Sequence, residues 1–158
     1  MDPAAVSREL RTASSDDLRR RRRVVGLSLV SAASMGLISL YQSGIVEHLP
    51  EPPLRLFDAE RVDSAPEAYP FGIPDSTLGL ASYGMTIALA TAGGTRRPRW
   101  LALAYGAKIA ADAAMAVKLT LDQRRKHRAY CSWCLLASAA TLGTVPLAAP
   151  EVLRALRG

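Results

Sequence analysis

Residues 24 to 46 read VVGLSLVSAASMGLISLYQSGIV, and no charged side chain interrupts them. An α-helix rises about 1.5 Å per residue and the hydrocarbon layer of a bilayer is about 30 Å thick, so this stretch is long enough to cross a membrane. Two further windows are free of charge, residues 76 to 95 and 129 to 150, and Trp100 to Val117 contains only Lys108 and Asp112. The sequence therefore predicts four membrane-spanning helices.

The average composition conceals these windows. The chain has 158 residues, of which 49% are hydrophobic and 22% charged, and these averages alone would suit an ordinary soluble domain. A soluble helix would show polar residues at every third or fourth position on its outer face. Here the non-apolar positions are Ser, Thr, Gly and Gln, which membrane helices use at helix contacts. We expect an all-α integral membrane protein, a four-helix bundle with an outer loop between its first two helices.

The first window has an alternative interpretation as a cleaved export signal. Arg19 to Arg23 form a basic region, and Ser31-Ala32-Ala33 has the small residues of a cleavage site. The hydrophobic region of a signal peptide is only about 7 to 15 residues long, however, whereas this one continues to Val46. We expect the segment to be retained.

The basic residues set the expected orientation. With a cytoplasmic N-terminus, the inside segments hold twelve Lys and Arg side chains, and on the outside residues 47–75 and 122–128 hold six. The positive-inside rule then places both termini in the cytoplasm, and we expect a multi-pass protein of a bacterial inner membrane. Residues 122 to 128, DQRRKHR, oppose this assignment, because they would lie outside and are as basic as an inside loop.

The net charge of +6 and the pI of about 9.8 raise the question of nucleic-acid binding. The basic residues form short clusters beside the expected spans, where they would contact anionic lipid head groups, and no nucleic-acid-binding module is recognisable. We therefore expect the lipid bilayer, and not nucleic acid, as their partner. The expected organisation is a basic cytoplasmic tail over residues 1–23 with a loosely ordered start, a four-helix domain over 24–150, and a short C-terminal tail over 151–158.

The segment between the first two expected spans, Glu47 to Pro74, carries six acids against two arginines. Pro50, Pro52 and Pro53 are expected to stop the first helix, since proline breaks a helix interior. At the far end of the segment, Asp75 or Ser76 is placed to cap the second helix. We expect an acidic loop that covers the outer face of the bundle.

The chain has two cysteines, and both lie in Tyr130-Cys131-Ser132-Trp133-Cys134 at the expected start of the last helix. The three-residue spacing puts both thiols on one side of the first turn, close enough to form a disulfide. The positive N-terminus of the helix and the basic residues upstream favour thiolates. We expect a redox-active dithiol in which Cys131 is the more exposed and Cys134 lies one turn deeper.

Other interpretations of this pair involve metals or no chemistry at all. Two cysteines are too few for a closed tetrahedral zinc site, and the chain has only two histidines, so we expect no metal. A c-type haem needs a histidine directly after the second cysteine, where this chain has Leu135. Two inert cysteines buried on a helix remain an open alternative.

The order of these parts resembles the vitamin K epoxide reductase family over about residues 24 to 150. The specific pieces are Phe71-Gly72-Ile73-Pro74-Asp75-Ser76 with Gly79, and the Cys131-Ser132-Trp133-Cys134 motif. The resemblance implies a thiol:quinone oxidoreductase with a ubiquinone- or menaquinone-type quinone beneath the outer loop. It implies that the catalytic Cys134 exchanges electrons with the quinone. It also implies that the catalytic Cys131 exchanges disulfides with a pair of cysteines in the outer loop, which in turn react with a thioredoxin-like protein. The implied quinone contacts are Asp75, Ser76, Phe71 and Ser138.

The chain departs from the family pattern in three places. It has no loop cysteine pair, and counting back from Phe71 the second of these should lie near Ala59. Asp75 stands where an Asn is common, and it can donate a hydrogen bond only when protonated, a form that burial favours. Ser138 stands where a Tyr is frequent and reaches less far.

The missing loop cysteines leave two outcomes open. Either Cys131 exchanges disulfides directly with a partner or a small thiol, or the protein has lost the protein-oxidising half of the cycle. The second outcome leaves open a different class of function, a non-catalytic quinone- or lipid-binding membrane protein with the same fold.

Lys108 and Asp112 are the two charges within the third expected span. They lie four residues apart, so they share a helix face and can pair. A charge inside a membrane helix is a candidate for function, here in the quinone pocket or on a proton path. We favour a structural ion pair between helices.

Overall fold

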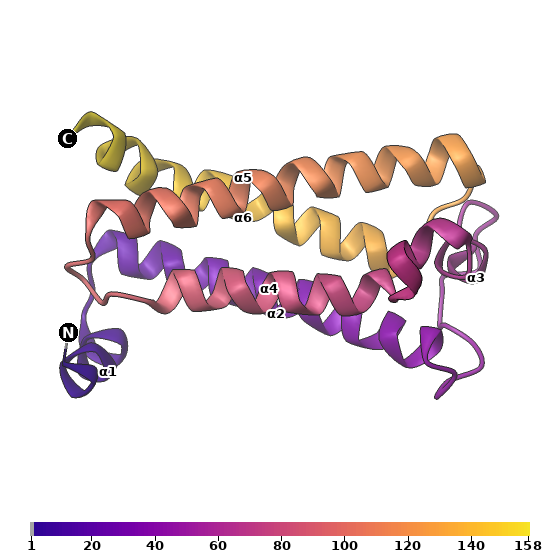
Figure 1. Ribbon diagram of the computed structural model, residues 1–158, viewed down its shortest axis with the longest axis horizontal. Helices are drawn as coiled ribbons and strands as arrows, with labels where there is room; N and C mark the ends of the chain where they lie inside the picture. Colours follow the sequence, from indigo (N-terminus) through magenta and orange to yellow (C-terminus); the bar gives the residue numbers. More distant parts are fainter. Residues whose placement is uncertain (1) are drawn as a thin grey trace.

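The computed structural model describes residues 2–158 as an assembly of helices (Figure 1). In chain order these are α1 (Pro3–Thr12), α2 (Asp16–Gln42), α3 (Ala59–Asp63), η1 (Pro66–Ala68), η2 (Pro70–Gly72), α4 (Asp75–Thr91), α5 (Arg99–Asp122), η3 (Gln123–His127) and α6 (Ser132–Arg157). No strand forms within these residues, and Phe57 and Tyr130 make an isolated parallel bridge. The prediction of an all-α protein is confirmed.

Three segments are long and apolar enough to cross a membrane: Asp16–Gln42, Arg99–His127 and Ser132–Arg157. The fourth expected span, α4, is shorter, with 17 residues. Large apolar side chains point outward from these helices, among them Leu29, Met85, Met115 and Leu142, which are 42% to 57% exposed. An exposed apolar surface of this kind marks a face that meets lipid or a partner, which supports an integral membrane protein.

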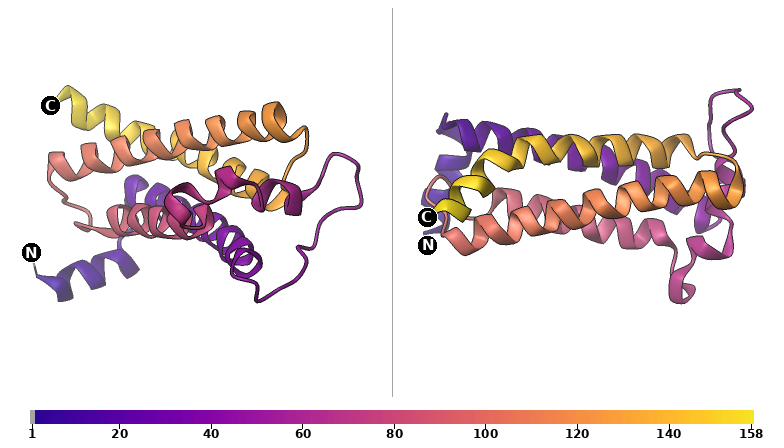
Figure 2. Two further views of the ribbon diagram at one scale, coloured as in Figure 1. Left: turned by 45° about the vertical axis from the view of Figure 1, so that its right-hand side comes forward. Right: turned by 90° about the horizontal axis from the view of Figure 1, so that it is seen from above.

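Helix α2 packs against both α4 and α6, and α5 packs against α6 (Figures 1 and 2). Small residues line these contacts. The Ser31 hydroxyl on α2 donates to the Ala137 carbonyl on α6 over 3.1 Å. A Cβ atom on Gly106 of α5 would lie 2.6 Å from Cγ2 of Val152 on α6, so any larger residue there would force Val152 to shift. Small residues that let backbones approach closely are typical of helix contacts in membranes.

The helix limits differ from the uncharged windows at several ends. Helix α2 already begins at Asp16, because the Ser15 hydroxyl accepts from the Leu18 N–H and caps the helix within the charged region. It ends at Gln42, ahead of the three prolines expected to stop it, and Gly44 follows with a φ of 75°. Helix α6 continues to Arg157, so most of the expected C-terminal tail is helical.

The expectation of a loosely ordered N-terminal tail is wrong, because residues 3–12 form α1 and pack onto the rest of the chain. The Glu9 carboxylate accepts from both the backbone N–H and the hydroxyl of Thr95, each over 2.8 Å. Arg22 donates to the carbonyls of Leu10 and Ala13 over 2.7 and 2.8 Å. These specific contacts offset the entropy of ordering a segment that is polar in composition.

Both termini lie at one end of the molecule, and α3 with the CxxC motif lies at the other (Figures 1 and 2). A buried ion cluster holds the terminal end together. Glu151 of α6 pairs with Arg97 over 2.6 Å and with Arg21 of α2 over 3.5 Å. Arg21 also donates to the Gly94 carbonyl, and the Arg97 guanidinium lies 4.6 Å above the Tyr105 ring. The cluster therefore joins α2, the α4–α5 connection, α5 and α6.

Candidate functional site

The two cysteines lie where the chain enters α6. Cys131 is the N-cap residue of this helix, and its Sγ accepts a hydrogen bond from the Cys134 backbone N–H over 3.2 Å. The buried Gln123 side chain holds the Cys131 backbone, since its Oε1 accepts from the Cys131 N–H over 3.0 Å. Both cysteines are free thiols, so this geometry is that of the reduced dithiol.

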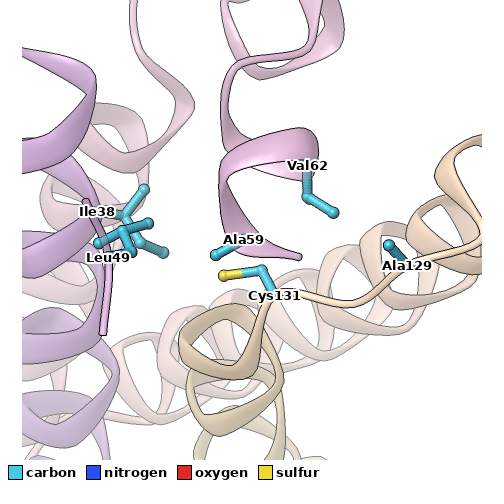
Figure 3. Packing of buried hydrophobic residues seen from close by; sticks show 6 residues of the cluster. All are labelled: Ile38, Leu49, Ala59, Val62, Ala129 and Cys131. Atoms are coloured by element: carbon cyan, nitrogen blue, oxygen red, sulfur yellow. The ribbon is translucent and has the colours of Figure 1, made fainter. Parts of the chain in front are cut away.

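The expectation that Cys131 is the more exposed cysteine is wrong. Cys131 has an exposed fraction of 0%, whereas Cys134 is only partly buried. Ile38, Leu49, Ala59, Val62 and Ala129 cluster with Cys131 and exclude water from it (Figure 3). Three of these residues belong to the 47–74 segment or its short helix, so the loop folded over the cysteine is the cause.

The 47–74 segment forms hydrogen bonds with the residues around the Cys131-Ser132-Trp133-Cys134 motif. The Asp58 N–H donates to the Tyr130 carbonyl and the Tyr130 N–H donates to the Leu56 carbonyl, over 3.0 and 2.9 Å. The indole N–H of Trp133 donates to the Pro50 carbonyl over 2.7 Å. The loop is therefore closed over the first turn of α6.

The Glu51 carboxylate accepts three hydrogen bonds that join the loop to α3 and α6. One of its carboxylate oxygens accepts from the backbone N–H and the hydroxyl of Ser132, over 2.9 and 3.0 Å. The other oxygen accepts from the Ala59 N–H over 2.5 Å. A carboxylate at a helix N-terminus is favoured by the helix dipole and by charge-assisted hydrogen bonds, so Glu51 joins the loop, α3 and α6 at one point.

The expectation of a Cys131 thiolate is also not met. The hydrogen bond with Cys134 acts to lower the pKa of the Cys131 thiol, but burial and the nearby charge of Asp63 outweigh it and raise this pKa above its ordinary value. The basic residues Arg124, Arg125 and Lys126 are exposed and too well solvated to reverse this. A base next to the dithiol is thus needed if a thiolate is to form at neutral pH.

Asp63 supplies a carboxylate at this point, although in the sequence it is only one of the six acids of the 47–74 segment. Its side chain is 1% exposed, and its Oδ1 accepts from the Cys134 thiol over 3.5 Å. Its Oδ2 is buried without a hydrogen-bond partner. Burial is the main reason that the Asp63 pKa rises from 3.8 to about 6. The sequence does contain a signal for this position. Asp63 follows Ala59 by four residues, so on a short helix the two side chains lie on the same face.

Ala59 lies where the family pattern would put the second loop cysteine. It is 1% exposed and belongs to the same cluster as Cys131, and Figure 3 shows the Cys131 sulfur pointing toward it. Ala59 therefore packs beside Cys131 and offers it no thiol.

The predicted quinone contacts are distributed unevenly around the cysteines. Gln42, at the end of α2, donates to the Asp63 carbonyl and to the Asp75 carboxylate, each over 3.0 Å. Ser76 donates to the Gln42 side-chain oxygen over 2.5 Å. Gln42 thereby brings Asp75 and Ser76 to the Asp63 side of the dithiol.

Ser138 and Phe71 lie farther from this network. Ser138 follows Cys134 by one turn of α6, and its hydroxyl lies 3.3 Å from the Thr120 hydroxyl of α5, whose own proton is donated to the Ala116 carbonyl. Phe71, in η2, is 99% exposed and has a φ of 57°. The structure therefore gathers two of the four predicted contacts near the dithiol, puts Ser138 one turn below it, and turns Phe71 outward.

Asp63, Cys131 and Cys134 have ligand atoms within 4.8 Å of one another. Three donors are one short of a closed tetrahedral zinc site, and two of them are sealed beneath the loop. We identify none of the three as a metal ligand.

Lys108 and Asp112 form an ion pair on α5 with both oxygens 2.5 Å from the lysine nitrogen. Ser82 and Thr86 of α4 donate to the same carboxylate over 3.0 and 2.8 Å. The four groups satisfy one another across two helices, which supports the structural interpretation of this pair.

The helices and the buried dithiol together define an all-helical membrane protein with a thiol site at the end opposite its termini. The sequence pattern of the Vitamin K epoxide reductase family matches residues 23–149, and the chain belongs to this family. A search of the curated proteins and a search of the solved structures each found no match. Members of the family are quinone-linked, and membership supports a redox enzyme and a multi-pass membrane protein.

Proposed function

We propose that this protein is an integral membrane thiol:quinone oxidoreductase whose Cys131 and Cys134 alternate between dithiol and disulfide. In one direction the two thiols give two electrons and two protons to a ubiquinone- or menaquinone-type quinone, which becomes a quinol, and an S–S bond forms. In the other direction a quinol returns them. The reaction is nucleophilic attack by a thiolate, as in other thiol exchange.

The observation that carries the proposal is the arrangement of the two thiols. They are the only thiols in the chain, they lie across the first turn of one helix, and the Cys134 N–H already contacts the Cys131 sulfur over 3.2 Å. Closing the disulfide needs little backbone movement at this spacing. A buried carboxylate within 3.5 Å of the Cys134 sulfur adds the chemistry of proton transfer.

The division of roles between the cysteines follows from their burial. Cys134 is the more exposed of the two residues and would meet the quinone, while Cys131 would complete the disulfide from beneath the loop. A thioredoxin-like protein or a small thiol could reach Cys131 only after the 47–74 segment opens. Ala59 cannot relay electrons, so Cys131 would exchange with that partner directly.

The residues around Cys134 suit a quinone. The Ser138 hydroxyl lies one turn below Cys134 and 3.3 Å from the Thr120 hydroxyl, and it could turn its single proton to a quinone carbonyl. Asp75 has one oxygen engaged by Gln42, which leaves the other for a ligand. Ser76 would hold Gln42 in place, and Phe71 would contact the quinone only after turning inward. A bound quinone would supply the two-electron acceptor.

For the membrane arrangement we propose four spans, in which α4 joins the three longer helices α2, α5 and α6. Its 17 residues rise about 26 Å, a shortfall that a locally thinner bilayer accommodates at modest cost. Both termini would lie in the cytoplasm of a bacterium and the dithiol near the outer face, where disulfides persist. The four-helix domain would cover residues 24–150, between the N-terminal tail and the end of α6.

The direct test is turnover in a membrane. The purified protein is reconstituted into vesicles with a soluble ubiquinone or menaquinone analogue and dithiothreitol, and quinol formation is followed. Wild type and the outward-facing control variant Leu136→Ala should turn over, and Cys131→Ala and Cys134→Ala should not. Equal quinol formation by all four proteins would refute the proposal.

A second function is favoured by one observation, the complete burial of Cys131 beneath a loop that has no cysteine. In that case the protein binds a quinone or a lipid without turnover. Saturable quinone binding without any loss of thiols would identify this function and exclude the first.

A further inference from the structure

We propose that Asp63 is the proton acceptor for the Cys134 thiol, a catalytic residue that converts this thiol to the reactive thiolate. This inference rests on the proposed thiol:quinone chemistry and names the base which that chemistry needs. It comes from the position of one carboxylate, at the end of a five-residue helix in the outer loop.

The geometry of Asp63 is that of a base already in contact with its substrate proton. Oδ1 receives the Cys134 S–H over 3.5 Å, which is within hydrogen-bond range for sulfur. Oδ2 is buried and has no partner, so it can take a proton without breaking another bond. General bases act over such a contact, because the proton moves along an existing hydrogen bond.

The loop holds this carboxylate rigidly. The backbone carbonyl of Asp63 accepts from Gln42 over 3.0 Å, so the side chain is positioned without being neutralised. Asp58 caps the start of α3 by accepting from the Arg61 N–H over 3.0 Å. The site is thus built by contacts that leave the Asp63 side chain free for the thiols.

The charges around Asp63 explain why it can both hold and release a proton near neutral pH. Facing it are Cys131 and Cys134 from α6, Asp75 from α4 and Glu51 from the loop, and no Lys, Arg or His pairs with it within residues 2–158. Burial first, and then the charges of Asp75 and Glu51, raise its pKa to about 6. Asp63 is therefore mostly ionised at pH 7, yet far more basic than a surface aspartate.

The step balances in protons and electrons. The Cys134 proton moves to an Asp63 oxygen, and the electron pair of the S–H bond remains on sulfur. Formation of the S–S bond with Cys131 transfers two electrons to the quinone. The two thiol protons, one of them by way of Asp63, end on the two quinol oxygens, and the carboxylate is restored.

Asp63→Asn is the deciding variant, because it keeps the shape of the side chain and removes the proton acceptor. At pH 7 the quinone-reduction rate should fall about 100-fold, the lower range for loss of a general base, while the quinone KM stays unchanged. The wild-type rate should rise with pH through an apparent pKa near 6, and this limb should be absent in Asp63→Asn. Glu60→Gln, on the same short helix, is the matched control: the Glu60 side chain is half-exposed and pairs with His48, so this variant should keep the wild-type profile.

A second reaction separates this proposal from the quinone function. Dithiodipyridine oxidises thiols through a thiolate without any quinone, so its rate should show the same pH limb and the same loss in Asp63→Asn. Wild-type reaction with this reagent but not with quinone would refute the proposed function and leave the role of Asp63 standing. Equal rates and equal pH profiles for wild type and Asp63→Asn would overturn the role of Asp63. If Asp63→Asn fails to fold, Asp63→Glu provides the test. Its carboxylate is one methylene farther from the backbone, so the apparent pKa of the rise in rate with pH should shift. An unaltered pH profile would overturn the proposal.

Discussion

Glu51 allows a quantitative test of the closed loop. Its two carboxylate oxygens accept three hydrogen bonds, from the Ala59 N–H, the Ser132 N–H and the Ser132 hydroxyl. In Glu51→Gln one oxygen becomes an amide nitrogen, which cannot accept. At least one N–H donor then loses its partner at the joint between the loop and α6.

The size of the effect follows from that lost bond. A donor left without a partner costs about 1 to 3 kcal/mol, and we take about 2 kcal/mol as the loss in loop-closing free energy. Because 1.4 kcal/mol corresponds to a factor of ten, the open fraction should rise about 30-fold. Cys131, which is 0% exposed in the closed state, can react only from the open state.

The assay is the alkylation rate of Cys131 by iodoacetamide in a Cys134→Ser background, where it is the only thiol. Adding Glu51→Gln should speed alkylation about 30-fold at a fixed pH, and the exposed Glu47→Gln should leave it unchanged. An increase below about threefold would show that Glu51 does not hold the loop closed. Equal increases for Glu51 and Glu47 would assign the effect to charge alone.

Three further predictions concern the loop and the two ends of the molecule. Ala59→Cys should form a disulfide with Cys131 on mild oxidation, seen as a linked peptide by mass spectrometry, because the two side chains are neighbours in one cluster; no such peptide would contradict this placement. Folded Asp63 has a pKa of about 6 against an ordinary 3.8, so the folded state binds the extra proton between these values. The free energy of unfolding should therefore fall by about 2.4 kcal/mol as pH rises from 4 to 7 on account of this group, and urea titration of Asp63→Asn should lack that fall. Glu151→Ala should lower the free energy of unfolding by about 3 to 5 kcal/mol, since it leaves two buried arginines unpaired; a loss below about 1 kcal/mol would exclude the ion cluster as a support of the terminal end.

The fold was predictable from charge placement, and the limits of the helices were not. Windows without charge identify the long helices, because burying or lipid-exposing a charge is costly. The start of α2 depends on a cap at Ser15 within the charged region, and α1 depends on the contact between Glu9 and Thr95. Such contacts between distant residues leave no periodic pattern in the sequence.

The positions of the two thiols could be predicted from the sequence, whereas the residues that surround them could not. The spacing of Cys131 and Cys134 places both on the first turn of α6, and the structure agrees. The reversed order of their exposure depends on the 47–74 segment folding back over Cys131, which local helix rules do not describe. Asp63 and Glu51 reach the site only because the same loop folds over the start of α6. In the sequence they therefore look like ordinary surface acids.

Thiol consumption in a single turnover tests the central claim most directly. Reduced protein freed of excess reductant is mixed anaerobically with one equivalent of a quinone analogue, and quinol and free thiols are counted together. We predict one quinol formed and two thiols lost per chain for wild type, and none of either for Cys131→Ala or Cys134→Ala. Quinol formed without thiol loss, or no quinol from wild type, would contradict the account.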